Sequence, residues 1–122
     1  MKKEFIPCEQ ALELKELRYD EQYIACYTNE GELLLEETWK HRYSIKAPLY
    51  QQAFRWFREK YGLYSEIFVD DNKTFGFYIT SFIEEGRLDK PITRQFNTYD
   101  KAQLGCVKQL IEIIDRKDEA YQ

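Results

Sequence analysis

Residues 50–64 read YQQAFRWFREKYGLY, a stretch in which six of fifteen residues are aromatic, with two arginines and a lysine among them. On a helical wheel the apolar side chains gather on one face. That face consists of Tyr50, Ala53, Phe54, Phe57 and Tyr61, with Leu49 and Trp56 along one edge. The opposite side consists of Gln51, Gln52, Arg55, Arg58 and Glu59. Because rings and cations segregate, the pattern predicts a core helix, ended by Gly62, rather than a platform on which bases stack.

Two further helices are predicted near the ends of the chain. Residues 7–17, PCEQALELKEL, begin with a proline suited to a first helical turn and carry a short apolar stripe. That stripe consists of Ala11, Leu14 and Leu17. Residues 99–115 repeat apolar side chains at three- and four-residue spacing. They are Ala102, Cys106, Val107, Leu110, Ile113 and Ile114. Gly105 costs this helix about 1 kcal/mol relative to alanine, which favours a role in close packing.

Two hairpins are predicted between the helices. The first joins QYIACYT to ELLLEE through a turn at residues 28–31, and the second joins YSEIFVD to TFGFYITSFIEE through residues 71–73. The strand after the second turn has two apolar faces, which indicates a central strand covered on at least part of both sides. Gly76 within it indicates a bulge or a close approach of neighbouring backbone. We expect a connection at residues 38–48, a polar loop at 85–91, and then a short edge strand, ITRQFNT.

This order of elements predicts the α+β class. Consecutive hairpins favour an antiparallel sheet, here of four or five strands from the two hairpins, packed with three helices. A chain of 122 residues, 43% hydrophobic and 33% charged, fits a single globular domain over residues 1–122. The residues from about 116 onward form a polar tail.

Charge, hydropathy and cysteine content indicate the cellular location of the protein and the kinds of partner it can have. The net charge is −4 and the isoelectric point is near 5.1, which argues against a large basic surface for nucleic acid. No window holds the roughly 18 uninterrupted apolar residues that a membrane-spanning helix needs. Three cysteines without close spacing are typical of reduced thiols. We therefore expect a cytoplasmic protein with no membrane partner.

The residues that could carry chemistry do not assemble into a known pattern. His41 lies between Lys40 and Arg42, where a solvated loop residue is favoured over a general base. Zinc sites use ligands two to four residues apart, a spacing that the cysteines lack, so buried thiols are favoured over a metal site. Residues 70–72, Asp-Asp-Asn, are explained by turn formation rather than by calcium binding. We expect no catalytic residues, metal or other cofactor.

Three segments carry a resemblance to a known family. EQALELKEL with YDE, APLYQQAFRWFREKYGLYSEI and FNTYDKAQLGCVKQLIEII resemble a family of small uncharacterised proteins of bacteriophages, prophages and related mobile elements of gut anaerobic bacteria. The resemblance implies an N-terminal, a central and a terminal helix, the last entered through Thr98, Tyr99 and Ala102. Arg18 replaces an expected glycine, and Gly105 replaces a helix former. The family implies a phage-related accessory role but no functional residues.

These observations lead to two functional hypotheses, with a small enzyme of unrecognised site ranked below both. The first is a noncatalytic accessory protein of a phage or mobile element that acts through protein–protein interaction. The alternative is a nucleic-acid-associated protein that uses a local patch of cations and rings, which the net charge disfavours. The candidate partner contacts are Trp39, Lys40, Arg42, Arg55, Trp56 and Arg58. The partner protein is not specified by the sequence, and homo-oligomerisation is left open.

Overall fold

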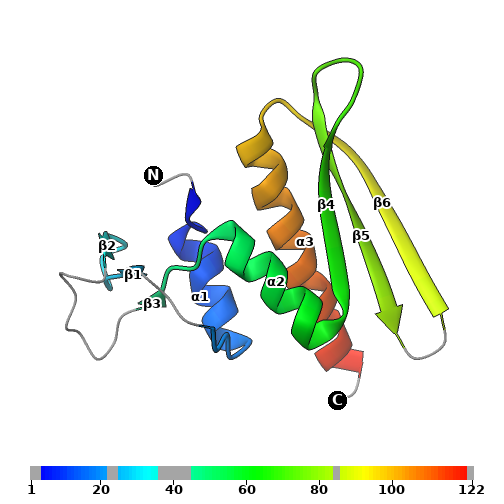
Figure 1. The fold of residues 1–122 in the computed structure, drawn as a ribbon. Helices are drawn as coiled ribbons and strands as arrows, with labels where there is room; N and C mark the ends of the chain where they lie inside the picture. The colour runs from blue at the N-terminus through cyan, green and yellow to red at the C-terminus, as the bar shows by residue number, and fades with distance from the viewer. Residues whose placement is uncertain (1–3, 22–24, 36–44, 84–85, 121–122) are drawn as a thin grey trace. The chain divides into compact units, whose positions relative to one another are not determined.

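A computed structural model describes residues 4–21, 25–35, 45–83 and 86–120. These residues divide into two compact units, Met1–Ala53 and Phe54–Gln122, and the division falls inside helix α2 (Tyr50–Tyr61). The α+β class is confirmed, with three helices and two separate antiparallel sheets of three strands among the described residues (Figure 1). The prediction of one sheet with four or five strands is not confirmed. Each hairpin instead belongs to a sheet of its own.

The first unit combines one helix with a small sheet. Its elements are α1 (Cys8–Glu16), β1 (Ala25–Tyr27), β2 (Leu33–Leu35) and β3 (Ile45–Lys46). β1 lies in the centre and pairs antiparallel with both neighbours, so the predicted first hairpin is confirmed where the structure describes it. The third strand was missed, because residues 38–48 were predicted to be a connection. Two residues are too short to produce an alternating pattern, so β3 forms only through its pairing with β1.

The end of α1 explains how a helix stops without a glycine. Arg18 has a positive φ of 65°, the left-handed conformation that usually selects glycine after a helix. The backbone N–H of Tyr19 then donates to the carbonyl of Leu14 at 3.0 Å, which satisfies one of the last helical carbonyls. Along the predicted stripe Ala11 and Leu14 are buried, whereas Leu17 is only partly buried.

A buried tyrosine ties the N-terminal segment to the small sheet. The Tyr27 hydroxyl donates to the Ile6 carbonyl at 2.7 Å, and the Ile6 N–H donates to the Pro48 carbonyl at 2.9 Å. Burial, followed by the charge of the nearby Cys8 thiolate, raises the pKa of Tyr27. The hydroxyl therefore stays protonated and keeps its donor role at neutral pH.

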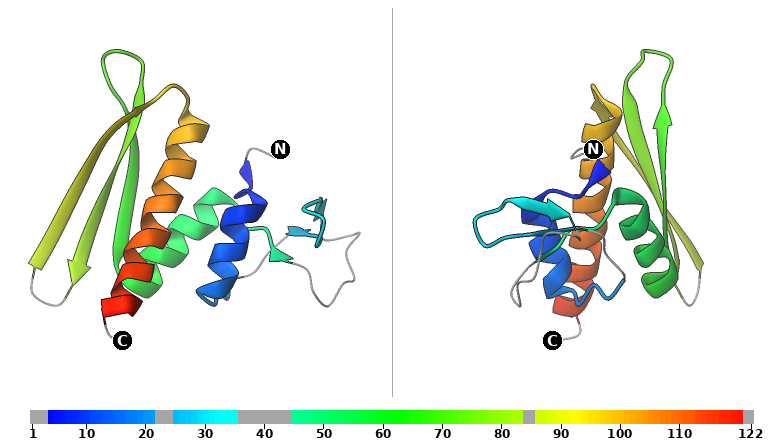
Figure 2. Two further views of the ribbon diagram at one scale, coloured as in Figure 1. Left: turned by 180° about the vertical axis from the view of Figure 1, so that it is seen from behind. Right: turned by 60° about the vertical axis from the view of Figure 1, so that its left-hand side comes forward.

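The second unit is a three-stranded sheet with a long helix on one face. Its strands are β4 (Leu63–Val69), β5 (Phe75–Ile83) and β6 (Gly86–Phe96), and its long helix is α3 (Tyr99–Ala120). The strands pair in sequence order, so β5 is central, as predicted. Figures 1 and 2 show α3 running along one face of this sheet. α2 ends just before β4 at Gly62, whose φ of 66° confirms the predicted stop.

The edge strand β6 is longer than predicted. Residues 86–91 form strand, where a polar loop was expected, and they pair with β5 from Gly86 opposite Ile83 to Pro91 opposite Tyr78. A proline lacks the N–H that a central strand needs, but an edge strand leaves every second N–H unpaired. The polar composition was therefore misleading: it reflects an edge position rather than a loop.

The core of this unit lies between α3 and the inner face of the sheet. Leu63, Phe77 and Ile79 are buried on the strands. The buried residues of α3 include Ala102, Cys106, Val107, Leu110, Ile111 and Ile114, so the predicted stripe is confirmed apart from Ile113, which is partly buried. A Cβ atom on Gly105 would lie 2.6 Å from Cζ of Phe96. The close packing predicted at this glycine is confirmed.

Candidate functional site

The face of β4 and β5 opposite to the buried side chains carries exposed tyrosines. From Leu63 to Ile67 and from Phe77 to Ser81, more buried and more exposed side chains alternate, as expected for a sheet with one covered face. Tyr64 is 44% exposed and Tyr78 is 45% exposed, and the exposed Glu66 follows Tyr64 by two residues along β4. In register, Glu66 stands opposite Tyr78 and Tyr64 stands opposite Thr80. We call the surface made by Tyr64, Glu66 and Tyr78 the tyrosine face.

Phe68 closes one end of the tyrosine face. Its ring covers Gly76 on the neighbouring strand, where a Cβ atom would lie 2.5 Å from Cζ of Phe68. The same ring lies 4.7 Å from that of Tyr78, with a tilt of 31°. The register of β5 with β6 also shifts between Phe75 and Phe77, which confirms the bulge predicted at Gly76. This contact fixes one side of Tyr78 and leaves the rest of its ring exposed.

Tyrosine rings fixed on a sheet are suited to binding rather than to acid–base catalysis. A ring on a strand loses little side-chain freedom on contact with a partner, and its hydroxyl supplies a hydrogen bond at the rim. Tyrosine is among the residue types enriched at protein interfaces and at their energetic centres. Glu66 is the only charged residue in β4 and β5. The tyrosine face is therefore a small aromatic surface with one negative charge.

The three predicted partner contacts that the structure describes do not form a comparable surface. Arg55 and Arg58 are exposed on α2, as expected. Trp56 is only 2% exposed, and its ring packs edge-on against Phe57 at 5.1 Å and Tyr61 at 5.3 Å. Trp56 therefore belongs to the interior and does not offer its ring to a partner. The remaining candidates, Trp39, Lys40 and Arg42, lie outside the described residues.

The sequence pattern did not predict the tyrosine face. The sequence predicts that both faces of β5 are at least partly covered, and on the face that carries Tyr78 the ring of Phe68 packs against it while Tyr78 stays 45% exposed. The useful signal lay in β4, LYSEIFV, where Tyr64 and Glu66 share one side of an alternating strand. Because register decides which residues of two strands face each other, this cluster could not be assembled from one strand alone.

The candidate metal ligands are explained by local structure. The Asp70 carboxylate accepts hydrogen bonds from the N–H groups of Asn72 at 2.9 Å and Thr74 at 3.2 Å, and from the Thr74 hydroxyl at 2.6 Å. These bonds, above all the one from the Thr74 hydroxyl, lower the pKa of Asp70. The predicted turn is confirmed. Within the described ranges, no group of three or more His, Cys, Asp or Glu residues could hold a metal ion.

The cysteines separate by burial. Cys26 and Cys106 are buried, as predicted, whereas Cys8 is partly exposed. Burial raises the pKa of Cys106 to about 12, although a side-chain hydrogen bond with Ser65 acts in the opposite direction. Because the thiolate is the reactive form, Cys106 is inert at neutral pH in the folded protein. His41, the remaining candidate for acid–base or metal chemistry, lies outside the described residues.

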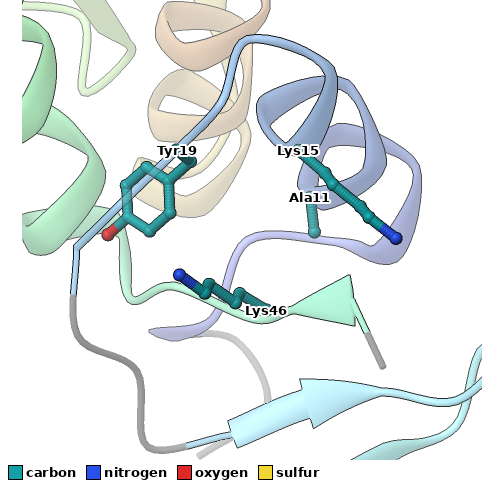
Figure 3. A pocket seen from close by; sticks show the side chains of 4 residues that line it. All are labelled: Ala11, Lys15, Tyr19 and Lys46. Atoms are coloured by element: carbon teal, nitrogen blue, oxygen red, sulfur yellow. The ribbon is translucent and has the colours of Figure 1, made fainter. Parts of the chain in front are cut away.

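A small pocket in the first unit is a weaker candidate. It has a volume of about 100 Å³ and is lined by Ala11, Lys15, Tyr19 and Lys46. Figure 3 shows Lys46 extending toward Tyr19, whereas the ammonium group of Lys15 points away from both. Since the two cations do not converge, the pocket lacks the arrangement that would hold an anion.

Comparison with protein families, with characterised proteins and with solved structures finds no match to this chain. In the described part of the chain, no helix combines the length and the apolar character needed to span a membrane.

Proposed function

We propose that this chain is a noncatalytic accessory protein that binds another protein through the tyrosine face. One observation carries the proposal: Tyr64 and Tyr78 remain nearly half exposed on one sheet face, while Leu63, Phe77 and Ile79 on the opposite face are buried. Large apolar groups gathered on a surface mark a site of interaction more often than isolated ones do. Tyrosine rings in particular contribute much of the binding energy in protein interfaces.

The resemblance to small phage and prophage proteins supports an accessory role in a phage or other mobile element. In that role the partner would be either a host protein or another product of the element. The partner is not specified by the fold, because one fold can carry many unrelated functions.

A nucleic-acid partner is less well supported. Stacking of bases requires rings and cations on one surface, but Arg55 and Arg58 lie on α2, whereas the rings of the tyrosine face lie on β4 and β5. Glu66, between the two tyrosines, would repel phosphate. The net charge of −4 adds to this repulsion.

Affinity capture from nuclease-treated lysates of cells that carry the element tests the proposal. The tagged full chain is compared with the double variant Tyr64→Thr/Tyr78→Thr. Threonine removes both aromatic rings and, like tyrosine, is a residue type that favours β-strands. Tyr99→Thr is the matched control, since Tyr99 is 45% exposed at the start of α3. Thermal melting confirms that all three proteins are folded.

We expect a protein that is retained by the wild type and by Tyr99→Thr, but lost with the double variant. Capture of the same proteins by all three would show that the tyrosine face is not the binding surface. A protein that the wild type captures from an untreated lysate but not from the nuclease-treated lysate would favour the nucleic-acid alternative instead.

A further inference from the structure

The position of Glu66 within the tyrosine face restricts what can bind there. Residues directly opposite on paired strands have Cβ atoms about 4.5–5.5 Å apart, and diagonal neighbours are about 7–8 Å apart. Glu66 is directly opposite Tyr78, and Tyr64 lies two residues before Glu66 on the same strand. The position of Glu66 is therefore next to the positions of both exposed tyrosines.

The register extends this pattern across the sheet. One row of facing positions consists of Glu66, Tyr78 and Pro91. The row two residues along the strands consists of Tyr64, Thr80 and Asp89. The only charged residues in these two rows are acidic. Arg87 stands one row farther along, opposite Phe82. Among the described side chains in these rows, Glu66 is the one that carries a charge, and that charge is negative.

Aromatic rings and a carboxylate attract the same kind of group. The face of an aromatic ring carries negative electrostatic potential and attracts the ammonium group of lysine or the guanidinium group of arginine. A carboxylate beside the ring adds a direct charge interaction and accepts hydrogen bonds, which arginine donates in pairs. A phosphate or an acidic side chain would meet repulsion from the same surface.

We propose that the tyrosine face binds a basic segment of the partner protein, placing an arginine or lysine side chain against Tyr64 and Tyr78 and beside Glu66. This inference rests on the proposed function, because it assigns the chemistry of the partner at the same surface. The positive segment is complementary to the net negative charge of the chain.

Peptide titrations followed by NMR test the inference. The probe is an unstructured glycine–serine peptide with two arginines, added to the isotope-labelled full chain. Two matched peptides carry citrulline or glutamate at the same positions, since citrulline keeps the shape of arginine without its charge. We expect the arginine peptide to shift the amide signals of Tyr64, Glu66 and Tyr78, and added salt to weaken this binding. The citrulline and glutamate peptides should bind more weakly.

Variants separate the rings from the charge. Tyr64→Phe keeps the aromatic face and should bind as the wild type does, whereas Tyr64→Thr should weaken binding by about two- to fivefold, as expected for one exposed cation–π contact. Glu66→Gln should reduce the preference for arginine over citrulline. Tyr99→Thr, equally exposed elsewhere, should have no effect.

The outcomes distinguish this inference from the proposed function. Equal or stronger binding of the citrulline or glutamate peptide, or an absence of shifts on the tyrosine face, overturns the cationic partner. A single-stranded oligonucleotide that shifts the same signals also overturns it. The broader proposal of a protein partner then stands or falls on the affinity capture, which depends on the two rings and not on the charge of the ligand.

Discussion

At the scale of single residues, glycine and phenylalanine are coupled at two places in the second unit. The ring of Phe68 covers Gly76 on the open face of the sheet, and the ring of Phe96 packs on Gly105 beneath α3. In both cases the ring occupies the space that a side chain on the glycine would need. The helix propensity lost at Gly105 is therefore accompanied by closer packing of α3 on the sheet.

Truncation of a core side chain gives the first prediction. Phe57 on α2 and Leu110 on α3 are both fully buried. Phe57→Ala should lower the free energy of unfolding by about 3–5 kcal/mol and Leu110→Ala by about 2–5 kcal/mol, through lost burial and the cavity left behind. Arg58→Ala, next to Phe57 but exposed, should change it by no more than about 0.5 kcal/mol. Denaturant unfolding measures all three, and losses near zero at Phe57 would refute its place in the core.

At the scale of elements, the two hairpins use the same turn. In the first, Gly31 N–H donates to the Thr28 carbonyl at 2.9 Å, and in the second, Lys73 N–H donates to the Asp70 carbonyl at 3.1 Å. Gly31 has a φ of 83° and Lys73 has a φ of 61°. Both residues hold the left-handed position that follows a β-turn in a three-residue hairpin loop. Only the second hairpin places a side chain there.

Replacing Lys73 tests this equivalence. A left-handed conformation costs a residue with a side chain about 1–2 kcal/mol, whereas glycine loses about 0.5–1 kcal/mol more entropy on folding. Lys73→Gly should therefore raise the free energy of unfolding by roughly 0.5–1 kcal/mol, measured by denaturant melts. The reciprocal change Gly31→Lys, at the matched position of the first hairpin, should lower it. A loss of stability in Lys73→Gly would show that a contact of the lysine side chain stabilises the fold by more than the left-handed backbone conformation destabilises it.

At the scale of the whole chain, α2 links the two units because the division between Ala53 and Phe54 falls within it. Buried residues lie on both sides of that point, with Tyr50 and Ala53 before it and Phe57 after it. A helix of twelve residues is marginally stable by itself. Unravelling one half of α2 should therefore destabilise the other, and we expect the units to unfold together.

Cysteine alkylation measures this coupling. Cys26 reports on the first unit and Cys106 on the second, since both are buried. In the native protein, Cys8 should be the one cysteine that is alkylated at neutral pH. Burial keeps the reagent from Cys26, and a pKa of about 12 keeps the Cys106 thiol protonated. With increasing denaturant, peptide mapping should show Cys26 and Cys106 becoming modified over the same range. Reaction of one well before the other would mean that the units unfold independently.

The sequence by itself located the three helices and both hairpin turns, because these depend on signals within a few residues. The polar tail predicted from about residue 116 was wrong in part, since α3 continues to Ala120. Helical spacing located α2 and Gly62 marked its end. Asn29 and Gly31 marked the first turn, and Asp71 and Asn72 marked the second. The tertiary structure decided the pairing of strands: it separated the hairpins into two sheets, added β3 and extended β6 through Pro91. The tyrosine face belongs to this second group. Tyr64, Glu66 and Tyr78 lie on different strands, and only the register between β4 and β5, set by contacts distant in sequence, brings them onto one surface.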